Sequence, residues 1–361
     1  MVVKVGGRGA AARNTRRSAG QALSIALLLT GAWRRCGLPL VRITAKDDHR
    51  PSDHLVQSVL ALDPNRTQST SRPTPLVVGI GDFVLYRRLG SGGFAQVWLA
   101  MKKSTGDVYA IKAIRKATVK ELNTEAAIDV ENTILERHSC EFLVRGYFSF
   151  ESAQHIYFAL EFMPGGDLAT MLACCGFLPE AASRFYVCEV LAGVGYLHSQ
   201  QLIHRDIKPS NVLVGANGHV KLTDFGLSSS EKRKKRSGTL PYTAPEVLRG
   251  ENASKAVDFY SVGVLLFELL EGATPFAQHG NCDPDSPSSM LKAILNGKPD
   301  VERLPVLVRD LTVGLLCRQA SERIDYEGVV RHPWMEGVKW DQLLEEVPPF
   351  IPTLEDAADA S

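Results

Sequence analysis

The chain has 361 residues and a hydrophobic fraction of 45%, which is enough for one large core or two smaller ones. Its 41 Lys and Arg residues balance 40 Asp and Glu residues, so net charge favours neither nucleic acid nor an anionic membrane as a partner. The seven scattered cysteines contain no Cys-x-x-Cys pair, which argues against a zinc site and a disulfide framework. These features predict a soluble globular protein with reduced thiols in the cytoplasm, and they indicate no oligomeric state.

Residues 1–81 are predicted to be an N-terminal extension and a linker. Residues 1–46 are basic without a single acidic residue, and residues 22–32 form an apolar run. That run is too short for a membrane span of roughly 20 residues. Three interpretations stay open: a disordered or mis-assigned start, a transit peptide, and a signal or anchor segment. Residues 47–81 are polar and contain four prolines, so folded structure is expected to begin near Asp82.

A glycine-rich turn follows the first predicted strand. Residues 83–89 have a strand pattern, and residues 90–97 read Gly-Ser-Gly-Gly-Phe-Ala-Gln-Val. Glycines let the backbone approach phosphates and present N–H groups to them. Leu89, Gly90 and Gly92 are therefore candidate nucleotide contacts, although any hairpin turn can have this composition. Ala95 stands where the usual pattern has its third glycine.

A lysine and a glutamate further along form a candidate ion pair. Residues 108–112 resemble a strand that ends in Lys112, and residues 125–137 have a helical pattern that carries Glu131. A buried charge is costly unless it is paired. We therefore expect Glu131 to hold Lys112 in a nucleotide cleft, where the lysine would contact the α- and β-phosphates. Alone, such a lysine usually marks only the edge of a strand.

Residues 161–167 are predicted to link two lobes and to bind the nucleotide base. Residues 142–144 and 156–160 both read as strands, and the second runs into Glu-Phe-Met-Pro-Gly-Gly-Asp. The backbone of Glu161 and Met163 would meet the adenine edge, and Asp167 would take the ribose hydroxyls. The side chains expected around the ring are Val97, Ala110 and Leu213, with Leu160 behind it. For each apolar residue the alternative is an ordinary place in the core.

The strongest chemical signal is a polar loop after a predicted helix at residues 179–199. The loop reads His-Arg-Asp-Ile-Lys-Pro-Ser-Asn over residues 204–211, and Asp-Phe-Gly and Ala-Pro-Glu follow it. This order and spacing are typical of a phosphoryl-transfer site. Asp206 is the candidate proton acceptor and Lys208 the candidate to neutralise the transferred phosphoryl group. Asn211 and Asp224 are the candidate ligands of Mg²⁺, which prefers oxygen donors.

Together these motifs resemble those of eukaryotic serine/threonine protein kinases over roughly residues 83–334. The resemblance implies an α+β, two-lobed fold with a small β-rich N-terminal lobe and a larger helical C-terminal lobe, its domain at residues 82–334. It implies ATP and Mg²⁺ as cofactors and protein Ser/Thr hydroxyls as acceptors. The Lys208-Pro209 pair favours Ser/Thr over Tyr substrates. Arg323 is the expected partner of Glu246.

Other segments resemble the AGC group of these kinases, in particular the microtubule-associated serine/threonine kinase and greatwall-like branch. They include Gly-Gly-Asp-Leu at residues 165–168 and His-Val-Lys-Leu-Thr at residues 219–223. Residues 335–361 resemble the start of the AGC C-terminal tail and are expected to be a truncated tail. The resemblance also implies a moderate preference for substrates with basic residues upstream of the acceptor, read by Asp167 and Glu268.

Two positions depart from that pattern. Lys235 stands where AGC relatives carry a phosphorylated residue, so we expect activation without that phosphate and name Ser237 as an alternative site. Two further interpretations of the basic run around Lys235 stay open, a mobile solvated loop and a nuclear-import patch. The expected location is therefore the cytoplasm or the nucleus. Gly146 stands where relatives stack a large apolar side chain on Leu135, Phe225 and His204. A cavity there would cost of order a few kcal/mol, unless a partner or a neighbouring side chain fills it.

An alternative function is a nucleotide-binding pseudokinase scaffold. Such proteins generally lose the nucleotide-binding lysine, the proton-accepting aspartate or the metal-binding aspartate. Because Lys112, Asp206, Asn211 and Asp224 are all present, the sequence favours an active kinase.

Overall fold

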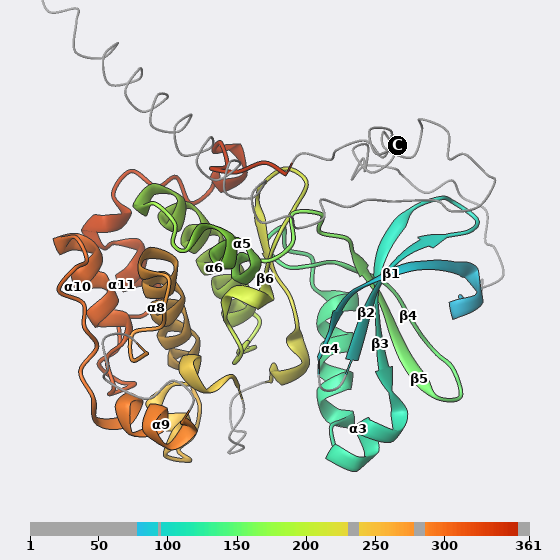
Figure 1. The fold of residues 1–361 in the computed structure, drawn as a ribbon, viewed down its shortest axis with the longest axis horizontal. Helices are drawn as coiled ribbons and strands as arrows, with labels where there is room; N and C mark the ends of the chain where they lie inside the picture. Colours follow the sequence, from blue (N-terminus) through green and yellow to red (C-terminus); the bar gives the residue numbers. More distant parts are fainter. Residues whose placement is uncertain (1–77, 93–94, 230–237, 278–285, 353–361) are drawn as a thin grey trace, which may run out of the picture.

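A computed structural model describes residues 78–92, 95–229, 238–277 and 286–352. These residues form a small lobe built on a twisted sheet beside a larger helical lobe (Figure 1), as the α+β expectation requires. Several predictions lie outside the described residues. They concern the apolar run at residues 22–32, most of the N-terminal extension, Lys235, Ser237 and the last part of the tail, residues 353–361.

The small lobe is a five-stranded antiparallel sheet in the order β1-β2-β3-β5-β4. A short turn, η1 (Ile80–Asp82), precedes it. The strands are β1 (Phe83–Ser91), β2 (Ala95–Lys102), β3 (Val108–Arg115), β4 (Gly146–Glu151) and β5 (His155–Glu161). On one side of the sheet, Phe83, Tyr109 and Ile111 are buried together, with Phe148 and Phe150 packed against them.

One predicted strand, residues 142–144, is wrong. Leu143 makes only an isolated bridge to Leu222 of the large lobe. The backbone of these residues pairs with the large lobe, because Val144 N donates to Leu222 O at 2.9 Å and Leu222 N donates to Phe142 O at 2.9 Å. The apolar run therefore reflects burial between the lobes, since Leu143 and Val144 are both buried.

Two helices accompany the sheet. Helix α3 (Lys116–Leu122) was not predicted, whereas α4 (Glu125–Arg137) has the predicted bounds. The buried residues of α4 are Ala127, Glu131, Ile134 and Leu135, which recur at helical spacing. This pattern turns one face of α4 toward the sheet and the large lobe, as Figure 1 shows.

The large lobe is helical and carries one small hairpin. The hairpin pairs β6 (Val212–Val214) with β7 (Val220–Leu222). The helices are α5 (Leu168–Cys175), α6 (Glu180–Ser199), α7 (Pro245–Leu248), α8 (Ala256–Glu271), α9 (Pro287–Asn296), α10 (Val306–Leu315) and α11 (Tyr326–Val330). The short 3-10 turns are η2 (Pro209–Asn211), η3 (Phe225–Leu227), η4 (Leu240–Tyr242), η5 (Pro333–Met335) and η6 (Leu343–Glu345). None of the helices in the described ranges has the length and apolar character that a membrane crossing requires.

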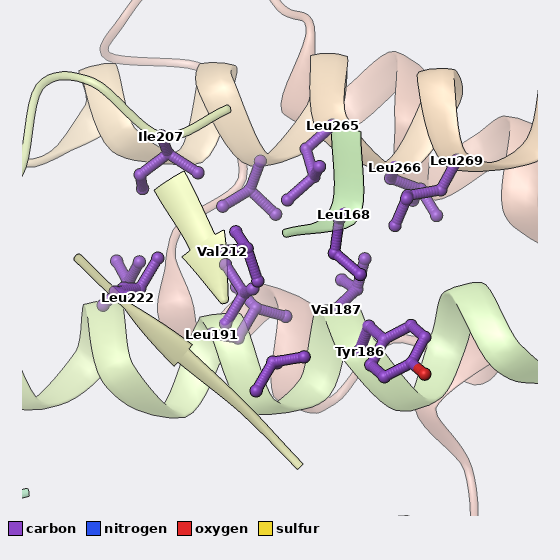
Figure 2. Packing of buried hydrophobic residues seen from close by; sticks show 14 of the residues in the cluster. Leu168, Tyr186, Val187, Leu191, Ile207, Val212, Leu222, Leu265, Leu266 and Leu269 are labelled. Carbon is purple, nitrogen blue, oxygen red and sulfur yellow. The ribbon is translucent and has the colours of Figure 1, made fainter. Parts of the chain in front are cut away.

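Helices α6 and α8 form the centre of the large lobe. Leu265 and Leu266 of α8 are fully buried, as is Leu191 of α6. Figure 2 shows the side chains of the two helices pointing toward each other, with Val212 of β6 between them. A helix that is apolar on all sides belongs in the interior. This packing gives the loop between α6 and β6, which carries the predicted catalytic residues, a rigid base.

The described part of the tail packs on the large lobe beside the linker between the lobes. Leu343 and Phe350 are buried in the same core cluster as α6 and α8. A Cβ on Gly218 would meet Pro348, and a Cβ on Gly165 would lie 2.7 Å from Pro352 Cγ. The tail therefore lies directly on the β6–β7 turn and on the interlobe linker.

Candidate active site

The loop before β6 is held by a buried carboxylate of α8. Asp258 accepts hydrogen bonds from the backbone N–H groups of His204 at 2.9 Å and Arg205 at 2.8 Å. It also lies 2.8 Å from His198 Nε2 at the end of α6. Burial opposes the ionised form, but the hydrogen bonds and nearby histidines outweigh it and lower the pKa of Asp258. These contacts anchor the loop to α8 and to the end of α6.

Asp206 is the centre of a small polar network. Its Oδ2 accepts from Lys208 Nζ at 2.7 Å and from Asn211 Nδ2 at 3.0 Å. Its Oδ1 accepts from the Thr239 hydroxyl at 3.0 Å and from the Thr239 N–H at 3.2 Å. Lys208 also reaches the Thr239 hydroxyl at 2.7 Å. The structure thus brings together the three predicted residues of this loop. It adds Thr239, which the sequence marked only by its position after Gly238, before the Ala-Pro-Glu motif.

A second polar group connects the small lobe to the Asp-Phe-Gly segment. Lys112 Nζ of β3 lies 2.6 Å from Glu131 Oε1 of α4 and 2.9 Å from Asp224 Oδ1. Burial opposes the positive charge of Lys112, but the two carboxylates outweigh it and raise the pKa of its ammonium group. Lys112 in turn lowers the pKa of Asp224, against the effect of burial. The predicted Lys112–Glu131 pair is present, and burial raises the pKa of the Glu131 carboxyl group against the opposing effect of Lys112.

Asn211 and Asp224 are suited to a hard cation. The Asn211 Nδ2 group donates to Asp206 O at 2.8 Å as well as to its carboxylate, which leaves the amide oxygen as a ligand. Asp224 has a left-handed backbone with φ of 63° and a side chain that is 47% exposed. Among the described residues, no group of three or more His, Cys, Asp or Glu side chains could hold a metal ion. Two oxygen ligands that share an ion with phosphate and water fit Mg²⁺, which seldom uses an all-protein cage.

The predicted adenine contacts lie at the junction of the lobes. Ala110 of β3 and Met163 of the linker are buried in the main core cluster, and Val97 and Leu213 pack against it. Ala110 pairs with Leu160 across the sheet, which places Leu160 on the strand next to it. These residues form an apolar wall that a flat base could contact, while Leu89 on β1 is 37% exposed.

The glycine-rich turn joins β1 to β2. Gly90 pairs with Val97 across the two strands, and Gly92 N donates to Ala95 O at 2.9 Å. A Cβ on Gly90 would have no heavy atom within 4 Å, so the backbone there is open to a ligand. Residues 93–94 lie outside the described part of the turn.

Two predicted linker contacts have further partners. The Glu161 carboxylate binds Lys221 of β7 at 2.9 Å and 3.0 Å, so this side chain ties the linker to the large lobe. Asp167 accepts from Thr170 N at 2.8 Å and caps α5. The backbone of Glu161 and the second oxygen of Asp167 are the atoms left for the predicted nucleotide contacts.

The predicted partner of Glu246 is confirmed. Arg323 donates to Glu246 through Nη1 at 2.7 Å and through Nη2 at 2.9 Å, and both side chains are buried. Paired geometry of this kind is strong because both N–H groups of the fork are used. It fixes α7, and with it the segment that carries Thr239.

The space beside Gly146 is filled by a neighbouring residue. A Cβ on Gly146 would lie 2.7 Å from Leu135 Cβ and 3.0 Å from Leu135 O. Of the outcomes left open for this position, a gap and its filling by a neighbour, the structure shows the second, because the last turn of α4 occupies the space of the missing side chain.

Comparisons with known proteins agree with this site. The protein kinase domain family matches residues 83–335, and the chain therefore belongs to that family. It is 35% identical over 323 residues to the probable serine/threonine protein kinase IRE4 of Arabidopsis thaliana, covering 79% of this chain and 30% of the relative. It is 36% identical over 301 residues to the serine/threonine-protein kinase YPK1 of Saccharomyces cerevisiae, covering 81% of this chain and 43% of the relative. The chain thus spans less than half the length of these relatives. No feature of the site supports the scaffold alternative, because all four residues whose loss would mark it are assembled.

Proposed function

We propose that this chain transfers the γ-phosphate of ATP to Ser and Thr hydroxyls of protein substrates. The observation that carries the proposal is the network around Asp206, in which Lys208, Asn211 and Thr239 all contact one carboxylate. The Lys112–Glu131–Asp224 group supplies the other half of the site. Phosphoryl transfer needs positioning and charge stabilisation more than covalent chemistry, and the site contains groups suited to both tasks.

The residues have separate tasks in this proposal. Asp206 orients the acceptor hydroxyl and takes its proton, while Lys208 neutralises charge on the transferred group. Lys112 contacts the α- and β-phosphates and is held in place by Glu131. Asn211 and Asp224 are the residues that would hold Mg²⁺, which supplies positive charge at the phosphate oxygens when it is bound. Thr239 holds the side chains of Asp206 and Lys208 in position before a substrate binds.

The test is transfer of labelled phosphate from Mg²⁺·ATP to a Ser-containing basic peptide. We expect Asp206→Asn to lower the rate by at least about a thousandfold, because it removes the general base and a charge-assisted contact to Lys208. ATP affinity should stay within about threefold, since Asp206 contacts the acceptor rather than the nucleotide. Equal rates for the parent and the variant would contradict the proposal.

We propose a moderate preference for basic residues upstream of the acceptor. Glu268 is one of the two carboxylates proposed to read them, but the Tyr242 hydroxyl donates to its Oε2 at 2.5 Å, and burial raises its pKa. A carboxylate with such a partner attracts a substrate cation less strongly, which supports a moderate preference. Peptides with Arg or Ala upstream should differ in kcat/KM by about tenfold, the effect of about 1.4 kcal/mol. Equal kcat/KM values would remove the proposal.

A groove beside Thr239 supports a protein as the acceptor. It has a volume of ≈ 350 Å³ and is lined mainly by apolar residues of η4, α7 and α9, among them Leu240, Leu248 and Leu291. Because Gly238 and Leu240 flank Thr239, a chain that presents its hydroxyl to Asp206 would extend toward this groove. An apolar residue after the acceptor should therefore raise kcat/KM relative to Asp there.

The finer classification is also a proposal. The segments at residues 165–168 and 219–223 support the AGC group and its microtubule-associated serine/threonine kinase and greatwall-like branch. Lys235 supports activation without a phosphate at the usual position. We also propose the cytoplasm or the nucleus as the location of the protein. Full activity of protein made in bacteria and treated with phosphatase would support this activation mode. An absolute need for an upstream kinase would exclude it.

A further inference from the structure

Gly146, at the start of β4, lies unusually close to the end of α4. An added Cβ would approach Leu135 Cβ to 2.7 Å and Leu135 O to 3.0 Å, whereas non-bonded carbons rest about 3.5–4.0 Å apart. The backbone φ of Gly146 is not positive. This position therefore requires glycine for its small size and not for its backbone conformation.

The close contact lies one helical turn from a catalytic pair. Leu135 follows Glu131 by four residues on α4, so the two side chains share a face, and both are buried. Glu131 Oε1 lies 2.6 Å from Lys112 Nζ. The same face of α4 thus meets the sheet at two places, at β4 through Leu135 and at β3 through Glu131.

The sheet connects these two places through paired strands, with a register shift in the β4–β5 pairing between Gly146 and Phe148. Gly146 pairs with Leu160 of β5, and Leu160 pairs with Ala110 of β3. Lys112 follows Ala110 by two residues and so lies on the same side of the strand. Any change in the distance between α4 and Gly146 is therefore passed to the Glu131–Lys112 pair, because the strands between them are hydrogen-bonded to one another.

The Glu131 side chain of α4 also borders the metal-binding segment. A Cβ on Gly226 would lie 3.6 Å from Glu131 Oε2 and 3.6 Å from Asp224 Oδ1. Phe225 is buried there, with its ring 5.5 Å from that of His204. Helix α4 is thus confined between the sheet and η3, which leaves it little room to shift.

We propose that Gly146 is a positioning residue that acts through α4. Because Gly146 has no side chain, Leu135 packs directly against its backbone, and we call this contact the seat. The seat sets the distance between α4 and the sheet at which Glu131 reaches Lys112. The catalytic part of this inference rests on the proposed phosphotransfer function, whereas the seat itself does not.

The test is Gly146→Ala, with Gly314→Ala as the matched control. A Cβ on Gly314 in α10 would have its nearest neighbour at an ordinary 3.5 Å. The added methyl at residue 146 must push α4 away by about 1 Å, and a displacement of that size can cost about a hundredfold in rate. We expect kcat to fall by about 10- to 100-fold for Gly146→Ala and its thermal unfolding midpoint to be lower than that of the parent, because the added methyl overpacks a confined contact. We expect both quantities to stay unchanged for Gly314→Ala.

A double-mutant cycle with Glu131→Gln separates positioning from general damage. If Gly146 acts through Glu131, the double variant should have no lower kcat than Glu131→Gln alone. Glu131→Gln should then lower kcat by about a hundredfold in the parent but by only about tenfold or less in the Gly146→Ala background. Equal effects of Glu131→Gln in both backgrounds would overturn the proposal, as would a parent-like kcat for Gly146→Ala. If Gly146→Ala does not fold, Leu135→Gly takes its place in the cycle, because it removes Leu135 Cβ, the atom that lies nearest to the Gly146 position.

Hydrogen exchange gives a readout that does not depend on activity. In the nucleotide-free chain, Gly146→Ala should speed amide exchange across residues 125–137 by at least about tenfold, and Gly314→Ala should not. Unchanged amide exchange in α4 would contradict the proposal that Gly146 positions this helix. Should the parent fail to transfer phosphate, the proposed function would be lost, while exchange would still decide whether Gly146 positions α4.

Discussion

The large lobe and the small lobe hold their catalytic residues by different means. In the large lobe, two backbone N–H groups of the loop that carries Asp206 bind the buried carboxylate of Asp258. In the small lobe, Lys112 is held only by side chains, at 2.6 Å from Glu131 and 2.9 Å from Asp224. Backbone donors cannot change rotamer, whereas a lysine and a glutamate keep several torsions each. Substitution of the Asp258 anchor in the large lobe should therefore mainly affect folding, and substitution of Glu131 in the small lobe should mainly affect activity.

Asp258→Asn should have the largest effect on folding. It removes a buried charge that satisfies His204 N, Arg205 N and His198, so the free energy of unfolding should fall by about 3–5 kcal/mol. Urea denaturation measures this change. Asp310→Asn is the control, because Asp310 pairs with His332 but its side chain is 78% exposed. Comparable losses in the two variants would remove the proposed role of the buried anchor.

Glu131→Gln should have the opposite profile. The amide is similar in shape and keeps one hydrogen bond to Lys112, so the free energy of unfolding should change by about 1 kcal/mol or less. Phosphotransfer should fall by about a hundredfold, because Lys112 loses the charge that positions it. Steady-state kinetics and urea denaturation on the same protein check both parts. A stability loss as large as that of Asp258→Asn would break the contrast between the lobes.

Lys221→Met tests the contact that joins the lobes. Lys221 of β7 binds the Glu161 carboxylate at 2.9 Å, and neither side chain is more than 19% exposed. We expect a loss of about 1 kcal/mol in the free energy of unfolding and a KM for ATP about twofold higher, because the linker is less firmly held. Lys116→Met is the control, since its partner Glu151 is 68% exposed. A change in neither quantity would show that the linker is held by its backbone alone.

Glu268→Gln gives the smallest effect, and one that depends on pH. Burial raises the pKa of Glu268 above its usual 4.5, so its favourable contribution to folding is present at low pH and is lost as pH rises through the raised value. The neutral amide escapes this loss. The stability of the variant relative to the parent should therefore rise by about 0.5 kcal/mol between pH 4 and pH 7. Thermal unfolding across this range measures it, and a constant difference would contradict the assignment.

Short-range patterns predicted much of this molecule from sequence. The bounds of α4 follow from apolar spacing, and the Lys112–Glu131 pair follows from the need to match a buried charge. The Glu246–Arg323 pair joins distant segments and was expected only from the family resemblance. The misses also depend on approaches between distant segments. Thr239 reaches Asp206 only because the chain folds back, and residues 142–144 pair with the large lobe instead of the sheet. At Gly146 the sequence left open whether a neighbour fills the space, because sequence position cannot show how closely α4 packs.

The packing of the tail also bears on where the independently folding unit ends. The family match stops at residue 335, yet Leu343 and Phe350 belong to the core cluster that holds α6 and α8. Phe350 is 3% exposed and Leu343 is 6% exposed. A chain cut at residue 335 would open both apolar sites to water, at a cost of about 1.5–3 kcal/mol for each side chain. The cooperative unit therefore extends at least fifteen residues beyond the boundary of the family, from residue 335 to Phe350.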